Sequence, residues 1–247
     1  MDSEGIYAPL QKSCNEIRLL ALDSAKGEDV SIVGHLNTIF LDVEPEYVAL
    51  SHCWGDPAVT EPIQIGEKTL KVTTNLALAL QKLRSLYSQR QFWIDAISIN
   101  QASVQERNIE VLRMGAAFVI AWLGSGDQPI KMDGKDMRMN LELGITLLSD
   151  LIQITDVEDE NQLAAFSKVR ECWSWESLQA ILDRDYWKRI WILQKLVLAR
   201  DVKFLIGNRS ISMNDMARGM VAAWKLRDSS LVGRERGGFT WYLIDSM

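Results

Sequence analysis

The chain has 247 residues, of which 47% are hydrophobic and 24% are charged, so it can bury one large core. Its net charge of -6 argues against nucleic acid as a partner, because phosphate binding needs clustered Lys and Arg. The apolar stretches are too short to cross a bilayer, and the N-terminus lacks the basic and apolar segments of a signal peptide. Three widely spaced cysteines without a CxxC pair predict a reduced, cytoplasmic protein.

The first part of the chain reads as strands followed by a helix. Short apolar runs predict strands at residues 17–22, 36–41 and 47–51. Residues 63–72 alternate around Gly66, which is typical of a hairpin. Thr74 or Asn75 can then cap a helix with one apolar face.

The next elements alternate between strand and helix. Residues 92–97 are predicted to form a buried strand, and the spacing of Ser103 and Glu106 matches a capping box at the start of a helix. Residues 118–123 form another apolar run, which stops at Gly124-Ser-Gly126. Strands that alternate with helices favour a parallel sheet with right-handed crossovers.

Residues 127–182 depart from this alternation and are predicted to be a helical insertion on the sheet. Helices are expected at 137–154 and 163–182, with an acidic loop between them. Asp185 is then expected to cap a helix, followed by a strand at 202–206 and a helix that starts at Ser212.

We therefore expect one domain over residues 1–247, whose parts share a single core. Its parts are N-terminal strands at 1–46, a core at 47–126, the insertion at 127–182, a helix-strand-helix segment at 183–226 and a tail at 227–247. The apolar residues 239–244 predict either a docked C-terminal helix or a larger parent protein that continues beyond this tail.

A polar group follows the third predicted strand, in the segment Ser51-His-Cys-Trp-Gly55. Adjacent residues of a strand point to opposite faces, so His52 is poorly placed to activate Cys53 as a nucleophile. We expect Cys53 in the core and His52 at the strand end. Trp54 and Gly55 are expected to shape the rim of a pocket.

A second polar group lies in and after the strand predicted at 92–97. Asp95 needs a specific partner there, which Arg107 or backbone amides could supply. It either holds the loop to Asn100 and Gln101 or accepts a hydrogen bond from a ligand hydroxyl, and both interpretations stay open. Glu106 fits a helix cap better than a catalytic acid, because of its capping-box spacing.

A third segment, residues 186–195, is rich in aromatic and cationic side chains. Trp187, Ile190, Trp191 and Gln194 share one helical face, which is expected to be core with Gln194 at a polar edge. Lys195 lies one turn after Trp191.

The sequence contains no credible metal site and no familiar nucleotide-binding loop. Two lone histidines and scattered cysteines lack ligand spacing, so no metal is expected. Gly124-Ser-Gly126 lacks the third glycine of a dinucleotide fingerprint, and a P-loop and a GxSxG elbow are absent from the sequence.

Taken together and in order, these segments resemble the heterokaryon-incompatibility (HET) domain of filamentous fungi. The resemblance rests on residues 17–20 (Ile-Arg-Leu-Leu), 47–55, 92–101, Glu106-Arg107, 122–124 (Trp-Leu-Gly) and 186–195. It implies an effector domain of non-self recognition that triggers programmed cell death when incompatible strains fuse. It also implies a homo-oligomer that works with a sensor or regulatory protein.

HET domains in turn resemble Toll/interleukin receptor (TIR) domains, several of which hydrolyse NAD. This second resemblance implies an α/β, TIR-like (flavodoxin-like) fold: a mostly parallel sheet flanked by helices, with an N-terminal β extension and a helical insertion. It implies no bound cofactor, and NAD or a related nucleotide as substrate. The nucleotide-binding residues implied are Ser51, His52, Trp54, Gly55, Asn100, Gln101, Arg107, Trp191 and Gln194.

The catalytic positions implied are Lys195, Asp95 and Glu106, and Lys195 stands where the family has a glutamate. Cleavage of nicotinamide from ribose builds positive charge, which a nearby carboxylate stabilises. An ammonium about 4 Å away opposes that charge by about 4 kcal/mol at an effective dielectric near 20, which is about a thousandfold in rate. We therefore expect an impaired NAD hydrolase, unless Asp95 or Glu106 replaces the carboxylate. The alternative is a non-enzymatic module that self-assembles or recruits a partner.

Overall fold

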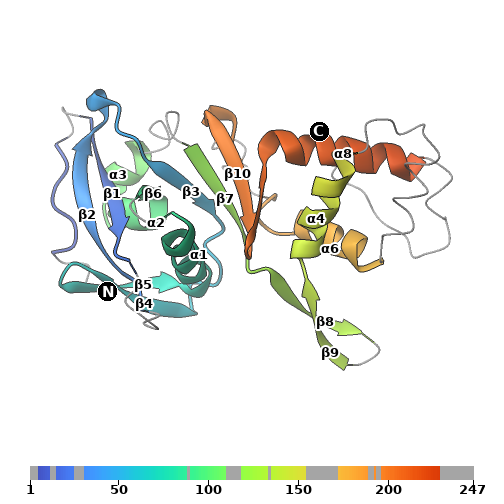
Figure 1. Cartoon of the computed structure of the whole chain (residues 1–247). Helices are drawn as coiled ribbons and strands as arrows, with labels where there is room; N and C mark the ends of the chain where they lie inside the picture. Colours follow the sequence, from blue (N-terminus) through green and yellow to red (C-terminus); the bar gives the residue numbers. More distant parts are fainter. Residues whose placement is uncertain are drawn as a thin grey trace. The chain divides into compact units, whose positions relative to one another are not determined.

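The structure is a computed structural model of the chain, which divides into two compact units (Figure 1). It describes residues 5–11, 15–24, 31–87, 90–109, 118–132, 135–153, 172–188, 192 and 196–228. The first unit comprises Met1–Ser125 and Lys188–Leu205, and the second comprises Gly126–Trp187 and Ile206–Met247.

The first unit is built on a mixed β-sheet. Its strands are β1 (Glu16–Leu22), β2 (Val33–Phe40), β3 (Val48–His52), β4 (Thr60–Ile65), β5 (Lys68–Thr73), β6 (Gln91–Ile94), β7 (Phe118–Gly124) and β10 (Asp201–Ile206). They lie in the order β10-β7-β3-β6-β1-β2-β4-β5. The predicted strands and the hairpin around Gly66 are thus confirmed to within a few residues, as is the α/β class.

The strand β3 lies inside this sheet, between β7 and β6, and runs parallel to both of these neighbours. Leu50 lies opposite Ile94 of β6 and Ile120 of β7. In contrast, β1 is antiparallel to both β2 and β6, which confirms an N-terminal β extension. Because β3, β6 and β7 run in the same direction, their carboxyl ends lie at one edge of the sheet.

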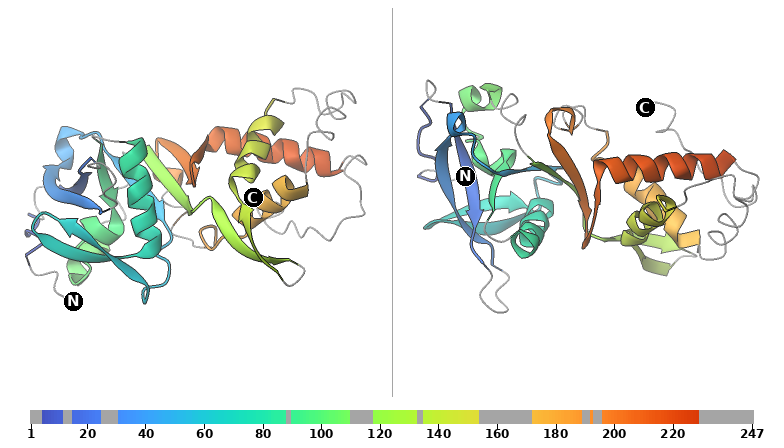
Figure 2. Two further views of the ribbon diagram at one scale, coloured as in Figure 1. Left: turned by 60° about the horizontal axis from the view of Figure 1, so that its bottom comes forward. Right: turned by 45° about the horizontal axis from the view of Figure 1, so that its top comes forward.

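Helices of the first unit are η2 (Leu41–Val43), α1 (Thr74–Leu86), α2 (Asp95–Ser98) and α3 (Val104–Ile109). Helix α1 lies against β4, β5 and β7 (Figure 2) and buries Leu76, Leu80 and Leu83 in the core of this unit. Its N-cap is Thr73, whose Oγ1 accepts from the Leu76 amide at 3.4 Å. The prediction of a cap at Thr74 or Asn75 is therefore wrong by one or two residues.

The strand predicted over residues 92–97 ends earlier than expected. It stops at Ile94, where the backbone amide donates to Ser98 Oγ at 3.0 Å, and Asp95 begins the single turn of α2. The Ile99 amide closes that turn by donating to the carbonyl of Asp95 at 3.4 Å. Asp95 consequently lies at the end of a strand, not in the middle of one.

The second unit combines a hairpin with packed helices. Its elements are β8 (Asp127–Met132), β9 (Lys135–Asn140), α4 (Glu142–Leu151), α6 (Cys172–Leu182), β11 (Arg209–Ser212) and α8 (Met213–Asp228). Helix α4 packs against α6 and α8. A Cβ atom added to Gly144 of α4 would lie 2.7 Å from the Leu178 amide nitrogen, so the close approach of α4 and α6 requires glycine there.

Two expectations for this unit need correction or remain open. A helix from residue 137 is wrong in its first part, because residues 135–140 pair with 127–132 as a hairpin before α4 begins. Residues 163–171, with which the next predicted helix begins, lie outside the described residues. The predicted start of α8 is confirmed, since Ser212 Oγ accepts from the Asp215 amide at 3.0 Å.

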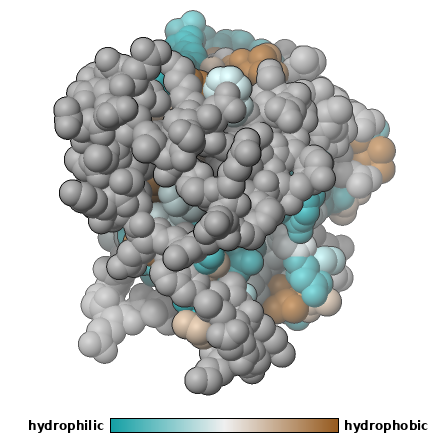
Figure 3. Space-filling model, turned by 90° about the vertical axis from the view of Figure 1, so that its right-hand side faces the viewer, coloured by the Kyte–Doolittle hydropathy of each residue, from teal (hydrophilic) through white to brown (hydrophobic). Residues whose placement is uncertain are grey.

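On the face seen in Figure 3, described hydrophobic residues form separate patches between hydrophilic ones. Among the helices that the structure describes, none is both long and apolar enough to cross a membrane.

Candidate functional site

Two polar side chains meet at the carboxyl ends of β3 and β6. His52 is the last residue of β3 and Asp95 directly follows β6. Their side chains approach each other, with Nδ1 of His52 3.9 Å from Oδ1 of Asp95. The imidazole is 1% exposed and the carboxylate is 19% exposed, so of the two side chains only Asp95 has an appreciable surface.

Asp95 organises the loop that follows it, which we call the β6 loop (residues 95–103). Its Oδ1 accepts from the Ala96 amide at 2.8 Å, and its carbonyl accepts from Nε2 of Gln101 at 2.8 Å. Asn100 Oδ1 accepts from the Ala102 amide at 3.1 Å. Of the partners considered for Asp95, the structure shows a backbone amide, that of Ala96, and the side chain of Arg107 lies outside the described part. Gln101 bonds to the Asp95 carbonyl and not to its carboxylate.

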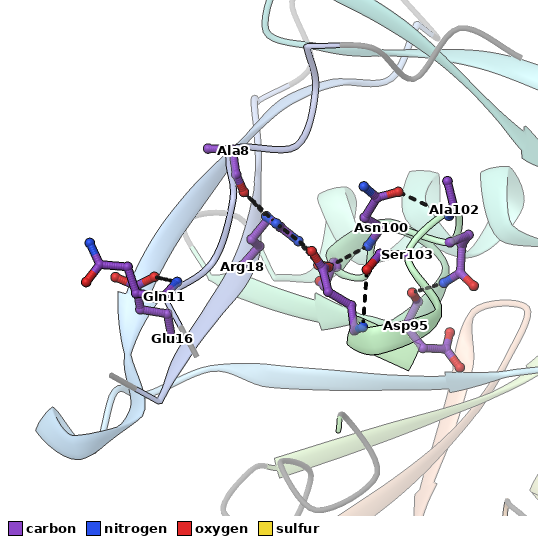
Figure 4. A network of polar contacts seen from close by, with 11 residues as sticks. Ala8, Gln11, Glu16, Arg18, Asp95, Asn100, Ala102 and Ser103 are labelled. Atoms are coloured by element: carbon purple, nitrogen blue, oxygen red, sulfur yellow. Dashed lines mark hydrogen bonds and ion pairs between the residues drawn. The ribbon is translucent and has the colours of Figure 1, made fainter. Parts of the chain in front are cut away.

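Glu106 is engaged by a cation that the sequence analysis did not single out. Arg18 of β1 donates from Nη1 to Oε2 at 2.8 Å and from Nη2 to Oε1 at 3.2 Å (Figure 4). Oε2 also accepts from the Asn100 amide at 3.0 Å, and the Glu106 amide donates to Ser103 Oγ at 3.3 Å. One half of the predicted capping box is therefore present, because Ser103 Oγ caps the helix. The other half is not, because the Glu106 carboxylate accepts from Arg18 and the Asn100 amide and not from the Ser103 amide.

The signal for Arg18 in the sequence was its position inside an apolar strand, Ile17-Arg-Leu-Leu20. A cation in such a strand is 2% exposed here and requires a carboxylate partner. That partner lies 88 residues away, so no local spacing could identify it.

A second cluster joins the carboxyl ends of β3 and β7. Nδ2 of Asn75 donates to the Cys53 carbonyl at 2.6 Å, and Oδ1 of the same amide accepts from Nε1 of Trp122 at 3.0 Å. Trp122 lies directly opposite His52 in the parallel register. Sequence reasoning treated Asn75 only as a helix cap and therefore missed this bridging role.

The segment after β3 differs from expectation in one respect. Cys53 was expected in the core, but it is half-buried, because β3 ends at His52 and the chain then turns. Trp54 is 40% exposed, and Gly55 adopts a φ of +76°, which favours glycine. Ser51 is fully buried, opposite Ala121 of β7.

The remaining predicted site residues lie outside the described part of the chain. These are Trp191, Gln194, Lys195 and the side chain of Arg107. The structure thus brings His52, Asp95 and Gln101 together, and the placement of position 195 beside them stays a prediction. Among the side chains that the structure describes, no group of three His, Cys, Asp or Glu could hold a metal ion.

Comparisons with known proteins give a consistent result. The family model described as "Heterokaryon incompatibility protein (HET)" matches residues 47–195, a range that contains all three sequence segments described above. The chain is 27% identical over 241 residues to "Heterokaryon incompatibility protein 6, OR allele" of Neurospora crassa. That match covers 82% of this chain and 35% of the relative, so the chain spans about a third of the relative's length. No solved structure gives a significant match.

Proposed function

Because the chain belongs to the heterokaryon-incompatibility (HET) family, we propose that it is an effector domain of fungal non-self recognition. In this role the domain triggers programmed cell death after cells of incompatible strains fuse. The name of the Neurospora relative supports the proposal, since it describes a heterokaryon-incompatibility protein. Activation by self-assembly, or by a sensor or regulatory protein, belongs to the same proposal.

For the chemistry, we propose hydrolysis of NAD or a related nucleotide at the ends of β3 and β6. The observation that carries this proposal is the position of Asp95, a partly exposed carboxylate at a strand end beside His52. The strand order supports it as well. The series β6-β3-β7-β10 runs 2-1-3-4 when these strands are numbered along the chain, as in flavodoxin-like folds, which bind ligands where that order reverses. The reversal lies between β3 and β7, so β3, whose end carries His52, borders this point and β6 is the next strand.

In the proposed reaction a water oxygen forms a bond to C1′ of the nicotinamide ribose. The bond from C1′ to the nicotinamide nitrogen breaks, and its electron pair neutralises the pyridinium. The water proton is released to solvent, so the products are ADP-ribose, nicotinamide and a proton. Asp95 stabilises the positive charge that develops on the ribose ring.

Asp95 is a better candidate for this role than Glu106. Glu106 accepts two hydrogen bonds from Arg18 and one from the Asn100 amide, so its negative charge is already compensated. Lys195 opposes the same developing charge if it occupies the position that the family resemblance implies. We therefore expect low turnover in the natural chain and higher turnover in Lys195→Glu.

The decisive experiment incubates concentrated protein with NAD and measures free nicotinamide. Lys195→Glu should release nicotinamide about a thousandfold faster than the natural chain, because it removes the opposing charge. Adding Asp95→Asn to that variant should abolish the gain. Asp23→Asn is the matched control. Asp23, directly after β1, lies 3.6 Å from His35 of β2 in a second His–Asp pair, which is exposed. Equal turnover in Lys195→Glu with and without Asp95→Asn would contradict the role of Asp95.

A non-enzymatic signalling module is the second candidate, and burial favours it. Ser51 and His52 are 0% and 3% exposed, which suits residues that stabilise the fold more than residues that hold a ligand. This alternative is supported if neither the natural chain nor Lys195→Glu releases nicotinamide under conditions in which the protein self-associates.

A further inference from the structure

Arg18 lies between two segments that are far apart in the sequence (Figure 4). On one side, its Nε and Nη2 donate to the Ala8 carbonyl at 3.2 Å and 2.5 Å. On the other side, Nη1 donates to the Ser98 carbonyl at 3.2 Å, and the guanidinium forms its bidentate contact with Glu106. All five donated bonds come from one side chain that is 2% exposed.

The N-terminal segment Gly5–Gln11 has further attachments near Arg18. The ring of Tyr7 lies 5.2 Å from Cζ of Arg18, at a distance suited to a cation–π contact. Burial raises the pKa of the Tyr7 phenol, with a smaller opposing effect of Arg18, so the ring stays neutral at physiological pH. The Gln11 amide donates to Oε2 of Glu16 at 2.6 Å. The segment is thus held at several points along its length.

The other side of Arg18 is the β6 loop, which carries Asp95. The Ser98 and Asn100 contacts of Arg18 and Glu106 fall within this loop. Ser98 Oγ also accepts from the amide of Ile94, the residue before Asp95. Each contact restricts the backbone within a few residues of the carboxylate.

We propose that Arg18 is a positioning residue that couples the N-terminal segment Gly5–Gln11 to the β6 loop and thereby to Asp95. The coupling itself needs only the observed contacts, and its catalytic consequence rests on the proposed function. A guanidinium can do this because its planar fork presents five donors in fixed directions, which an ammonium cannot match. Coupling between two segments is reciprocal, so loosening either one loosens the other.

The proposal assigns a regulatory role to the N-terminal segment. A partner or a neighbouring chain segment that pulls Gly5–Gln11 away removes the Ala8 carbonyl from Arg18. The guanidinium is then less constrained, and so are Glu106 and the Asn100 amide. Binding at the N-terminal segment would in this way change the position of Asp95 without contacting it.

Hydrogen exchange of backbone amides tests the coupling directly in the full chain. Arg18→Lys keeps the charge but loses the fork, so the Asn100 amide and residues 7–11 should both exchange about tenfold faster. Arg138→Lys is the matched control, because Arg138 pairs with Asp127 at an exposed position of the β8–β9 hairpin. Unchanged exchange at Asn100 in Arg18→Lys would overturn the proposal.

A variant of the N-terminal segment tests the direction of the effect. Tyr7→Leu removes the ring beside Arg18 and leaves the β6 loop itself unaltered. If the two segments are coupled, the backbone amides of Asn100 and of residues 7–11 should both exchange faster. A change confined to residues 7–11 would show that the segment is attached to the sheet but not coupled to the loop.

A double substitution separates positioning from stability. Arg18→Met with Glu106→Leu replaces a buried ion pair by apolar groups, an exchange that often preserves stability. If Arg18 positions the loop, the double variant recovers the melting temperature relative to Arg18→Met but exchanges fast at the Ala96 amide, whose acceptor Asp95 is unchanged in this variant. Recovery of both would overturn the proposal and assign the pair to stability alone.

Activity assays give the catalytic consequence separately. In the Lys195→Glu background, Arg18→Lys should lower kcat about tenfold with a smaller change in KM, because the carboxylate is misplaced in the transition state. An unchanged kcat in an active background would contradict the catalytic consequence. If the background itself releases no nicotinamide, the proposed hydrolysis fails, while the exchange experiments still decide the coupling.

Discussion

The two loops at the carboxyl edge of the first unit are held by different kinds of contact. The β6 loop is tied by a buried ion pair, in which Arg18 and Glu106 bind its backbone. The segment after β3, residues 53–59, is tied by neutral groups. Asn75 bridges the Cys53 carbonyl and Trp122, and the Thr74 amide and Oγ1 donate to the Val59 carbonyl. Both arrangements satisfy buried backbone groups, but they respond differently to substitution. An ion pair that loses one member leaves a buried charge, whereas an amide that is lost leaves only unpaired dipoles.

The largest expected effect comes from breaking the ion pair. Arg18→Met leaves the Glu106 carboxylate without its cation, and it should lower the free energy of unfolding by about 3–5 kcal/mol. Urea denaturation measures this. Arg138→Met, at an arginine that is 68% exposed, should stay within about 0.5 kcal/mol. A loss of less than about 1 kcal/mol in Arg18→Met would contradict the view that the ion pair stabilises its loop more than the Asn75 bridge stabilises residues 53–59.

A smaller effect is expected from the neutral bridge. Asn75→Leu leaves Nε1 of the buried Trp122 without its acceptor and should cost about 1–3 kcal/mol. Asn75→Asp keeps that acceptor, loses the donor to the Cys53 carbonyl and adds a negative charge in the first turn of α1, where the helix dipole stabilises it, so it should cost less. Denaturation followed by tryptophan fluorescence compares the two. An equal loss in both variants would mean that the hydrogen bond to the Cys53 carbonyl, and not the one from Trp122, accounts for the stability that Asn75 contributes.

Two glycines with positive φ give a third comparison. Gly55 lies in the turn after β3, and Gly66 lies in the turn between β4 and β5. Gly55→Ala places a Cβ 3.2 Å from Cβ of Asn75 in a residue with φ of +76°, and about 1–2 kcal/mol should be lost. Gly66→Ala is the matched control, because Gly66 has φ of +59° and no neighbour within 4 Å of a new Cβ. It should lose about 1 kcal/mol from backbone strain alone. A smaller loss at Gly55 than at Gly66 would show that the backbone around Gly55 can move away from Asn75 at little cost.

The smallest expected effect is a change in the free energy of unfolding at alkaline pH, caused by Tyr7 beside Arg18. The pKa of Tyr7 is raised in the folded state, mainly by burial, so the folded chain holds the phenol proton more tightly than the unfolded chain. This contribution to stability is fully present below a pH of about 10 and is lost as the pH rises above it. Tyr7→Phe should therefore flatten the decline of the free energy of unfolding above that pH. An identical decline in Tyr7→Phe would contradict the shift.

Local sequence patterns predicted many of the elements in both units. The strands that become β3 and β7, the hairpin around Gly66 and the start of α8 follow from apolar periodicity and from turn and cap residues. Asp95 was recognised as a residue that needs a partner, although it was placed inside a strand. The error arose because the strand and the turn of α2 read as one apolar run, and the bond from the Ile94 amide to Ser98 that separates them is not visible in that run.

The sequence by itself determined the family, most strands of the first unit and the polar residues at the strand ends, because each depends on neighbours in the chain. Only the tertiary structure decided that Arg18 binds Glu106 and that Asn75 binds Trp122. These partners are 88 and 47 residues apart, and a buried donor can be matched to any of several acceptors until the strands are paired. Strand order and register therefore select the contacts that hold Asp95 at the edge of the sheet.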